Sequence, residues 1–119
     1  MKAVSLLAFC LLISCTNLPP NQAQLVGEWR YSDKARTCHY VFEKNGQFHG
    51  EVTLHGKLFS KFTGRWSVQG DSLLYSYSGD QFHRIPAGAT DLDRLLSILP
   101  DSFKIEAADG SQRVYLRIR

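Results

Sequence analysis

Two patterns of apolar residues divide the chain. Residues 3–13 form one uninterrupted run of apolar or small side chains behind Met1 and Lys2. From Leu25 onward, short runs of alternating apolar and polar residues are separated by Gly, Asn and Asp turns, a pattern typical of antiparallel strands and hairpins. The predicted strands are 25–32, 37–43, 47–54, 58–68, 73–78, 94–99, 102–107 and 112–118.

The first clear hairpin allows its register to be tested. A two-residue Asn45-Gly46 loop would set Phe42 opposite His49 and scatter the apolar residues over both faces. A three-residue loop over 44–46, with Gly46 in the left-handed conformation, pairs Glu43 with Gln47 instead. The second register is predicted because it gathers one apolar face, made of Cys38, Tyr40, Phe42, Phe48, Gly50, Val52 and Leu54.

The same reasoning assigns faces to the later strands. On strand 58–68, Leu58, Phe62, Trp66 and Val68 are expected to point inward, and Lys57, Lys61, Thr63 and Arg65 outward. A two-residue Asp109-Gly110 turn would give the last hairpin the inward set Phe103, Ile105, Ala107, Val114, Leu116 and Ile118. Strands with one buried and one wetted face indicate an antiparallel meander.

The predicted fold is all-β, a small up-and-down barrel of eight strands, since closure removes exposed strand edges. Residues 91–99 are the ambiguous element, because Leu92, Leu95, Leu96 and Leu99 have helical spacing behind an N-cap-like Thr90-Asp91. One or two helical turns are the alternative to a strand there. The irregular connection 79–93 is the candidate for a flap over one barrel end.

The N-terminal run resembles the signal peptide of a bacterial lipoprotein. It is too short to span a membrane, which takes about 20 apolar residues. Leu12-Ile13-Ser14-Cys15 resembles the lipobox at which such precursors are cleaved and lipidated. The resemblance implies diacylglycerol on Cys15, further acylation (palmitate is the typical chain), and an outer-membrane address because Thr16 is not Asp. The alternative is an ordinary secretory signal, but no A-x-A-like site follows.

This interpretation divides the chain into three parts: a signal peptide at 1–14, a lipidated cysteine with a polar, proline-bearing tether at 15–24, and one domain at 25–119. Removal of Cys10 and acylation of Cys15 leave Cys38 without a partner, so it is expected to be a buried small hydrophobe, with an exposed reactive thiol as the alternative. Without lipidation, a Cys15–Cys38 disulfide would be the alternative.

Charge adds little to this picture. The formal net charge is +3, and positive and negative residues are interspersed without a run of one sign. Neither a nucleic acid nor an acidic partner is therefore indicated.

Several motifs along the domain resemble lipocalins and small lipocalin-like envelope domains. Gly27-Glu28-Trp29 matches their opening G-x-W, and 42–48, 64–71 and 101–117 follow in the expected order. The resemblance implies that Gly27 and Trp29 close one barrel end, with an arginine of the last strand stacked over the tryptophan. Arg117 is the positional match, but the Asp109-Gly110 register turns it outward. The chain is also shorter than a full lipocalin.

Nine aromatic residues are expected inside the barrel, where they either line a pocket or fill the core: Trp29, Tyr40, Phe42, Phe48, Phe62, Trp66, Tyr75, Tyr77 and Phe103. The packed core is favoured, because eight strands enclose little more than side chains. Trp66, Tyr75 and Tyr77 are the candidate ligand-binding residues, since a buried phenol needs a hydrogen-bond partner.

Other chemistry is weakly indicated. His39, His49 and Glu51 approach one another on the predicted surface, but no metal-ligand spacing supports a dedicated site. No nucleophile elbow or phosphate-cradling loop is present, so neither an enzyme nor a cofactor is expected. Lys57, Lys61 and Arg65 form an outward basic stripe that is either a solvated face or a contact for anionic headgroups.

The sequence thus predicts a lipid-anchored envelope protein whose barrel binds a small hydrophobic or amphiphilic ligand without catalysis. The alternative is an interaction or structural lipoprotein, inhibitor-like or assembly-associated, with a packed core and no ligand.

Overall fold

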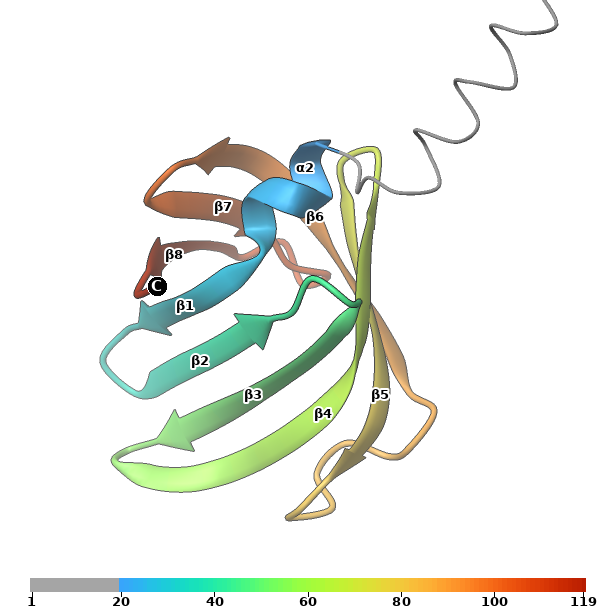
Figure 1. Ribbon diagram of the computed structural model, residues 1–119. Helices are drawn as coiled ribbons and strands as arrows, with labels where there is room; N and C mark the ends of the chain where they lie inside the picture. Colours follow the sequence, from blue (N-terminus) through green and yellow to red (C-terminus); the bar gives the residue numbers. More distant parts are fainter. Residues whose placement is uncertain (1–19) are drawn as a thin grey trace, which may run out of the picture.

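In the computed structural model, which describes residues 20–119, eight antiparallel strands close into an up-and-down barrel in sequence order (Figure 1). The predicted fold class is confirmed. The predicted signal peptide, Cys15 and the first part of the predicted tether lie outside the described residues. The elements are α2 (Pro20–Leu25), β1 (Gly27–Ser32), β2 (Arg36–Phe42), β3 (Gln47–Leu54), β4 (Lys57–Gln69), β5 (Ser72–Asp80), β6 (Thr90–Leu99), β7 (Ser102–Glu106) and β8 (Gln112–Arg117).

Helix α2 corrects the predicted tether. Residues 20–25 are helical rather than extended, and Leu25 is fully buried. The Gln22 side chain accepts a hydrogen bond from the backbone N–H of Val68, at 3.1 Å. The domain therefore begins with a short helix packed at one end of the barrel, where the chain enters it (Figure 1). No helix in this described part has the length and apolar character needed to cross a membrane.

The β2–β3 hairpin has the predicted register. Phe42 lies opposite Phe48, and Gly46 adopts a φ of +88°. The Asn45 side chain accepts a hydrogen bond from the N–H of Gln47, which holds the three-residue loop in place.

The register of the β7–β8 hairpin differs by one residue from the predicted register. Its loop is three residues long, because the N–H of Ala107 bonds to the carbonyl of Ser111 and Gly110 has a φ of +86°. Asp109 fixes the loop by accepting hydrogen bonds from the N–H and hydroxyl of Ser111. Every β8 side chain is thereby reversed. Val114, Leu116 and Ile118 are exposed, whereas Tyr115 is buried, and Arg117 lies on the inward face.

Residues 91–99 belong to strand β6, so the helical alternative is wrong. The strand pairs with β5 on one side and β7 on the other. A bulge between Leu95 and Ser97 inserts Leu96 as an extra residue and shifts the alternation by one. Together with the exposed Leu92 and Leu99, this irregularity explains why the leucine spacing resembled that of a helix.

Leu58 was expected to point inward but is exposed. A bulge opposite Val52 and Thr53 shifts the register at the start of β4, so that Ser60 faces the interior instead. The irregular connection is also shorter than expected, since β5 runs to Asp80 and β6 starts at Thr90. Residues 81–89, called the flap below, remain as the connection.

Candidate functional site

One end of the barrel, called the closed end below, is sealed around Trp29. Its indole is fully buried, stacks edge-on against Phe103 at 4.8 Å, and donates to the carbonyl of Leu25. The Arg117 guanidinium lies 4.2 Å from the indole centre, a cation–π geometry. The corrected β8 register is what allows this contact.

Arg117 also ties the closed end to its surroundings through backbone carbonyls. Its guanidinium donates hydrogen bonds to Pro100, Val26 and Gln24, at 2.7, 3.0 and 2.8 Å. Gly27 has a φ of +141°, and a Cβ there would lie 2.5 Å from an Arg117 nitrogen. Gly27, Trp29 and Arg117 are thus brought together as a plug.

The middle of the barrel is filled by aromatic rings. All nine rings expected inside are buried. Trp66 packs 4.8 Å from Phe42 and donates to the carbonyl of Glu43, and the Tyr75 hydroxyl donates to Asp93 at 3.0 Å. The polar atoms of these two rings are therefore already paired within the core.

Tyr77 lies in a different part of the barrel from Trp66 and Tyr75. It is the only one of the three that lines a cavity at the end of the barrel opposite α2. This mouth cavity has a volume of about 270 Å³. Its lining comes from β2, β3, β4, β5, β8 and the flap: Arg36, Cys38, Tyr40, Val52, Leu54, Phe59, Ser60, Phe62, Tyr77, Arg84, Ile85 and Arg113.

The flap is fastened at its root by Asp80. This buried carboxylate accepts hydrogen bonds from the Ser60 hydroxyl and from the N–H groups of Lys61 and Phe82. Burial alone would raise the pKa of Asp80, but these hydrogen bonds outweigh it and hold the pKa below its usual value. Arg84 stacks over the Phe59 ring at 4.3 Å, so the flap is held against β4 and borders the mouth cavity.

Phenol and thiol groups around the cavity stay protonated. Burial raises the pKa of Tyr40 well above its usual value, and it also raises the pKa of Tyr77, Tyr115 and Cys38. The buried hydroxyl of Tyr115 lies beside the Arg113 guanidinium, which opposes the effect of burial on the pKa of this phenol. Cys38 is a free thiol with 1% of its surface exposed, as expected of a buried small hydrophobe.

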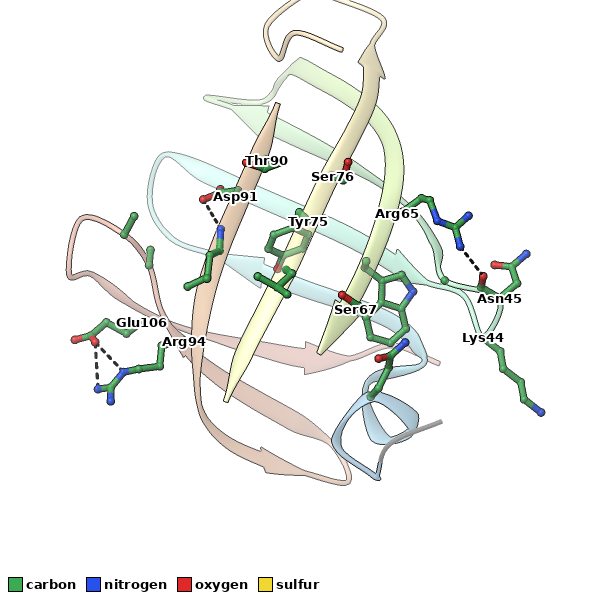
Figure 2. Close-up of a pocket in the computed structure, with 17 residues that line it drawn as sticks. Lys44, Asn45, Arg65, Ser67, Tyr75, Ser76, Thr90, Asp91, Arg94 and Glu106 are labelled. Carbon is green, nitrogen blue, oxygen red and sulfur yellow. Dashed lines mark hydrogen bonds and ion pairs between the residues drawn. The ribbon is translucent and has the colours of Figure 1, made fainter. Parts of the chain in front are cut away.

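A second, wider hollow of about 1050 Å³ crosses the outward faces of β4, β5 and β6 (Figure 2). We call it the outer groove. Trp66 and Tyr75 border it, but most of its lining side chains point outward. Its charges are mixed and partly paired: Arg94 pairs with Glu106 at 3.2 Å, and Arg65 donates to the carbonyl of Asn45. The groove therefore lies on the outer surface of the barrel.

The histidines and the basic stripe lie on the outside of the barrel. His39 faces Glu51 across the β2–β3 pair but bonds to Glu28 on β1, at 2.5 Å. Within residues 20–119, no three metal-binding side chains are grouped to hold an ion. Lys57, Lys61 and Arg65 are exposed along β4, and Lys61 pairs with Glu51 at 3.7 Å.

Sequence reasoning missed the arginines of the mouth and Tyr115. The signal was present, because Arg113, Tyr115 and Arg117 alternate along one strand. The register assigned to the last hairpin turned all three outward and so concealed them.

Comparison with known proteins supports the fold. No family model matches the chain, and no curated protein matches it. A crystal structure of a lipocalin-like protein from Bacteroides uniformis ATCC 8492 superposes with a TM-score of 0.59 at 19% identity, covering 80% of this chain and 99% of that one. The chain thus has a lipocalin-like barrel fold.

Proposed function

We propose that this protein is a non-catalytic binding module, anchored in the bacterial envelope, that holds a small hydrophobic or amphiphilic molecule in the mouth cavity. The observation that carries the proposal is the cavity itself, which is lined by inward side chains of the barrel and bordered by the flap. Ligand sites are concave and mostly apolar with a few polar groups. Val52, Leu54, Phe62 and Ile85 provide the apolar wall.

The closed end and the outer groove fit this role less well. At the closed end, Arg117 makes a cation–π contact with Trp29. The indole N–H and the guanidinium already donate hydrogen bonds to backbone carbonyls. The outer groove lies on the outward face of the sheet, and its charged side chains are partly paired with one another or with the backbone. At about 270 Å³ the mouth cavity lies slightly below the usual range of about 300–1,000 Å³, which favours a short ligand.

Cys38 supports a role without catalysis. A thiolate is the reactive form of cysteine, and burial raises the pKa of Cys38. The neighbouring His39 points outward and bonds to Glu28, so it does not activate the thiol.

The proposed anchor is an acylated Cys15 in the outer membrane, facing the periplasm. Cys15 precedes Pro20 by five residues, and α2 packs at the closed end. Anchoring through Cys15 would therefore hold the closed end nearest the membrane and leave the mouth accessible from the periplasm.

Native mass spectrometry of the protein purified from the envelope in mild detergent tests the binding role. We expect a fraction of the protein to carry a small molecule that is lost when the barrel is unfolded. The control is an Ile85→Trp variant, in which a larger side chain on the flap fills the cavity. A co-purified molecule retained equally by this variant would place binding elsewhere and contradict the proposal.

A second candidate function, protein interaction with an unoccupied barrel, is favoured by a different observation. Leu99, Val114, Leu116 and Ile118 are exposed, with Leu116 at 60%. Exposed apolar groups of this kind can mark interaction surfaces. This function predicts native spectra without a small molecule, together with an envelope protein whose cross-linking to the barrel is lost in Leu116→Ser.

A further inference from the structure

Aliphatic side chains gather on the outer wall of the barrel, toward its closed end. Val114 and Leu116 point outward from β8, Ile118 follows that strand, and Leu99 ends β6. Strand pairing brings them together, because Leu99 lies opposite Ser102, which in turn lies opposite Leu116. All four are exposed, with Leu99 at 58% and Leu116 at 60%. We call these four residues the apolar face. A contiguous exposed surface of this kind marks a site of contact with a partner or a membrane.

The opposite wall of the barrel has a different character. Strand β4 is the farthest from β8 in the closed order of eight strands. Over its middle, the outward side chains are Lys61, Thr63 and Arg65, all exposed and polar. The apolar face therefore belongs to one wall of the barrel and is not a general property of its outer surface.

The apolar face borders the point where the chain enters the barrel. Arg117, which lies between two of its residues, donates hydrogen bonds to the carbonyls of Gln24 and Val26 at the end of α2. It also donates to the carbonyl of Pro100, the residue after Leu99. Helix α2 and the apolar face therefore meet at the closed end.

The length of chain before α2 brings this end to the membrane. Cys15 precedes Pro20 by five residues, which span at most about 18 Å when fully extended. A lipid anchor on Cys15 therefore keeps the start of α2 within that distance of the bilayer. Because the apolar face meets α2, the surface that this tether presents to it is a lipid surface.

The charges around the apolar face fit phospholipid headgroups. Arg30 on β1 lies opposite Leu116, and Lys104 on β7 lies opposite Val114. Within residues 20–119 neither cation is in an ion pair, whereas the carboxylates of β1 and β7 are both paired. Asp101, exposed in the β6–β7 turn, balances only one of the two cations. Cations at the rim of an apolar surface are attracted to anionic lipid.

We propose that the apolar face docks the barrel on the phospholipid membrane, with Leu99 and Leu116 in the headgroup region and Arg30 and Lys104 beside lipid phosphates. Aliphatic side chains flanked by cations are the composition with which peripheral elements enter the membrane interface. The inference rests on the anchor of the proposed function and adds the surface by which the barrel meets the membrane. The β4 wall faces away from the bilayer.

Quenching by spin-labelled lipid tests this contact. The full-length lipidated protein is reconstituted into vesicles of phosphatidylethanolamine and phosphatidylglycerol that contain a doxyl-labelled lipid. A fluorophore is attached at Leu116→Cys or, as the matched control on the β4 wall, at Thr63→Cys; Cys38 is buried and stays unlabelled. Because a docked side chain lies about 5–10 Å into the interface, we expect quenching at position 116 to be at least about three-fold stronger than at position 63.

A second pair of variants separates the protein's own docking from any affinity of the fluorophore for lipid. Adding Leu99→Ser to the labelled Leu116→Cys protein should lower the quenching by about half, because a serine removes apolar area from the contact. Leu92→Ser is the matched control, at an exposed leucine of the outer groove, and should leave the quenching unchanged. Equal effects of the two serine variants would overturn the proposal.

The outcomes distinguish this inference from the function on which it rests. Equal quenching at positions 116 and 63, or stronger quenching at 63, would overturn docking by the apolar face and leave the anchor intact. Protein that does not remain with the vesicles would overturn the anchor and the docking together. Blue-shifted emission at position 116 without quenching by the doxyl lipid would assign the face to a second copy of the chain or to an envelope protein, and would also overturn the proposal.

Discussion

Asp93 is a buried carboxyl that the barrel holds without a cationic partner. Burial raises its pKa to about 6, against a partial opposing effect of the Tyr75 hydrogen bond. Because the folded protein holds the proton more tightly than the unfolded chain, this group favours folding below its unfolded pKa. The contribution is lost as the pH rises from about 4 through 6.

Asp93→Asn is therefore expected to stabilise the protein at pH 7.5 by about 3 kcal/mol and to have little effect at pH 4. The asparagine oxygen still accepts the hydrogen bond of Tyr75. Urea unfolding at the two pH values measures the difference. The exposed Asp91→Asn is the control, and a stabilisation of Asp93→Asn that is equal at both pH values would contradict the assigned pKa.

For single residues, the sequence predicted the nine aromatic rings expected inside, but it did not predict the burial of Tyr115 or which buried polar atoms are paired. The predicted registers placed Tyr75 inside and Tyr115 outside, whereas both rings are buried; the Tyr75 hydroxyl donates to Asp93 across the barrel, and the Tyr115 ring stacks on Phe103. The pairing of Tyr75 with Asp93 arises between strands distant in sequence, where no local pattern reports it.

At the level of elements, the two hairpins show that the length of a turn sets the register of the strands it joins. Both loops share one geometry: the side chain of Asn45 or Asp109 accepts the N–H two residues on, and the following glycine adopts positive φ. The first register was predicted because its apolar face was unmistakable. The second register was wrong because β8 carries apolar residues on its outer face. Their number favoured the two-residue turn over the three-residue turn. A three-residue loop assigned to both hairpins would have placed Arg113, Tyr115 and Arg117 on the inward face.

Arg117 provides the test of the corrected β8 register. Arg117→Lys keeps the charge but not the planar fork that reaches three carbonyls, so we expect a loss of about 2 kcal/mol in the free energy of unfolding. Urea denaturation measures it. Arg119→Lys, two residues on and largely exposed, should leave the midpoint unchanged. Equal losses in the two variants would show that Arg117 does not support the closed end.

For the whole molecule, the strand-and-turn pattern was sufficient to predict a closed eight-stranded barrel. It also favoured a packed interior, which describes the middle of the barrel. The cavity could not be predicted, because it is bordered by the bulged start of β4 and by the flap, two irregular features that the alternation of the strands does not report. Helix α2 was missed since six polar-rich residues carry no apolar period.

The position of the molecule in the cell is tested at Cys15. Metabolic labelling with palmitate should mark the wild-type protein, which should also sediment with the membranes. Cys15→Ala should take up no label and leave the membrane fraction with its barrel folded. Cys38→Ala is the control, because its thiol is buried and unmodified. Label that persists in Cys15→Ala would contradict the lipoprotein assignment.

The central claim is that the mouth cavity is the binding site. A ¹⁵N NMR titration of the full-length protein with hexanoate tests it most directly, since each backbone amide reports on its own surroundings. The account predicts saturable shifts at Cys38, Tyr77, Ile85 and Arg113, with Ser67, Leu74 and Leu92 of the outer groove unmoved. Shifts confined to the outer groove, or none at the mouth, would contradict it.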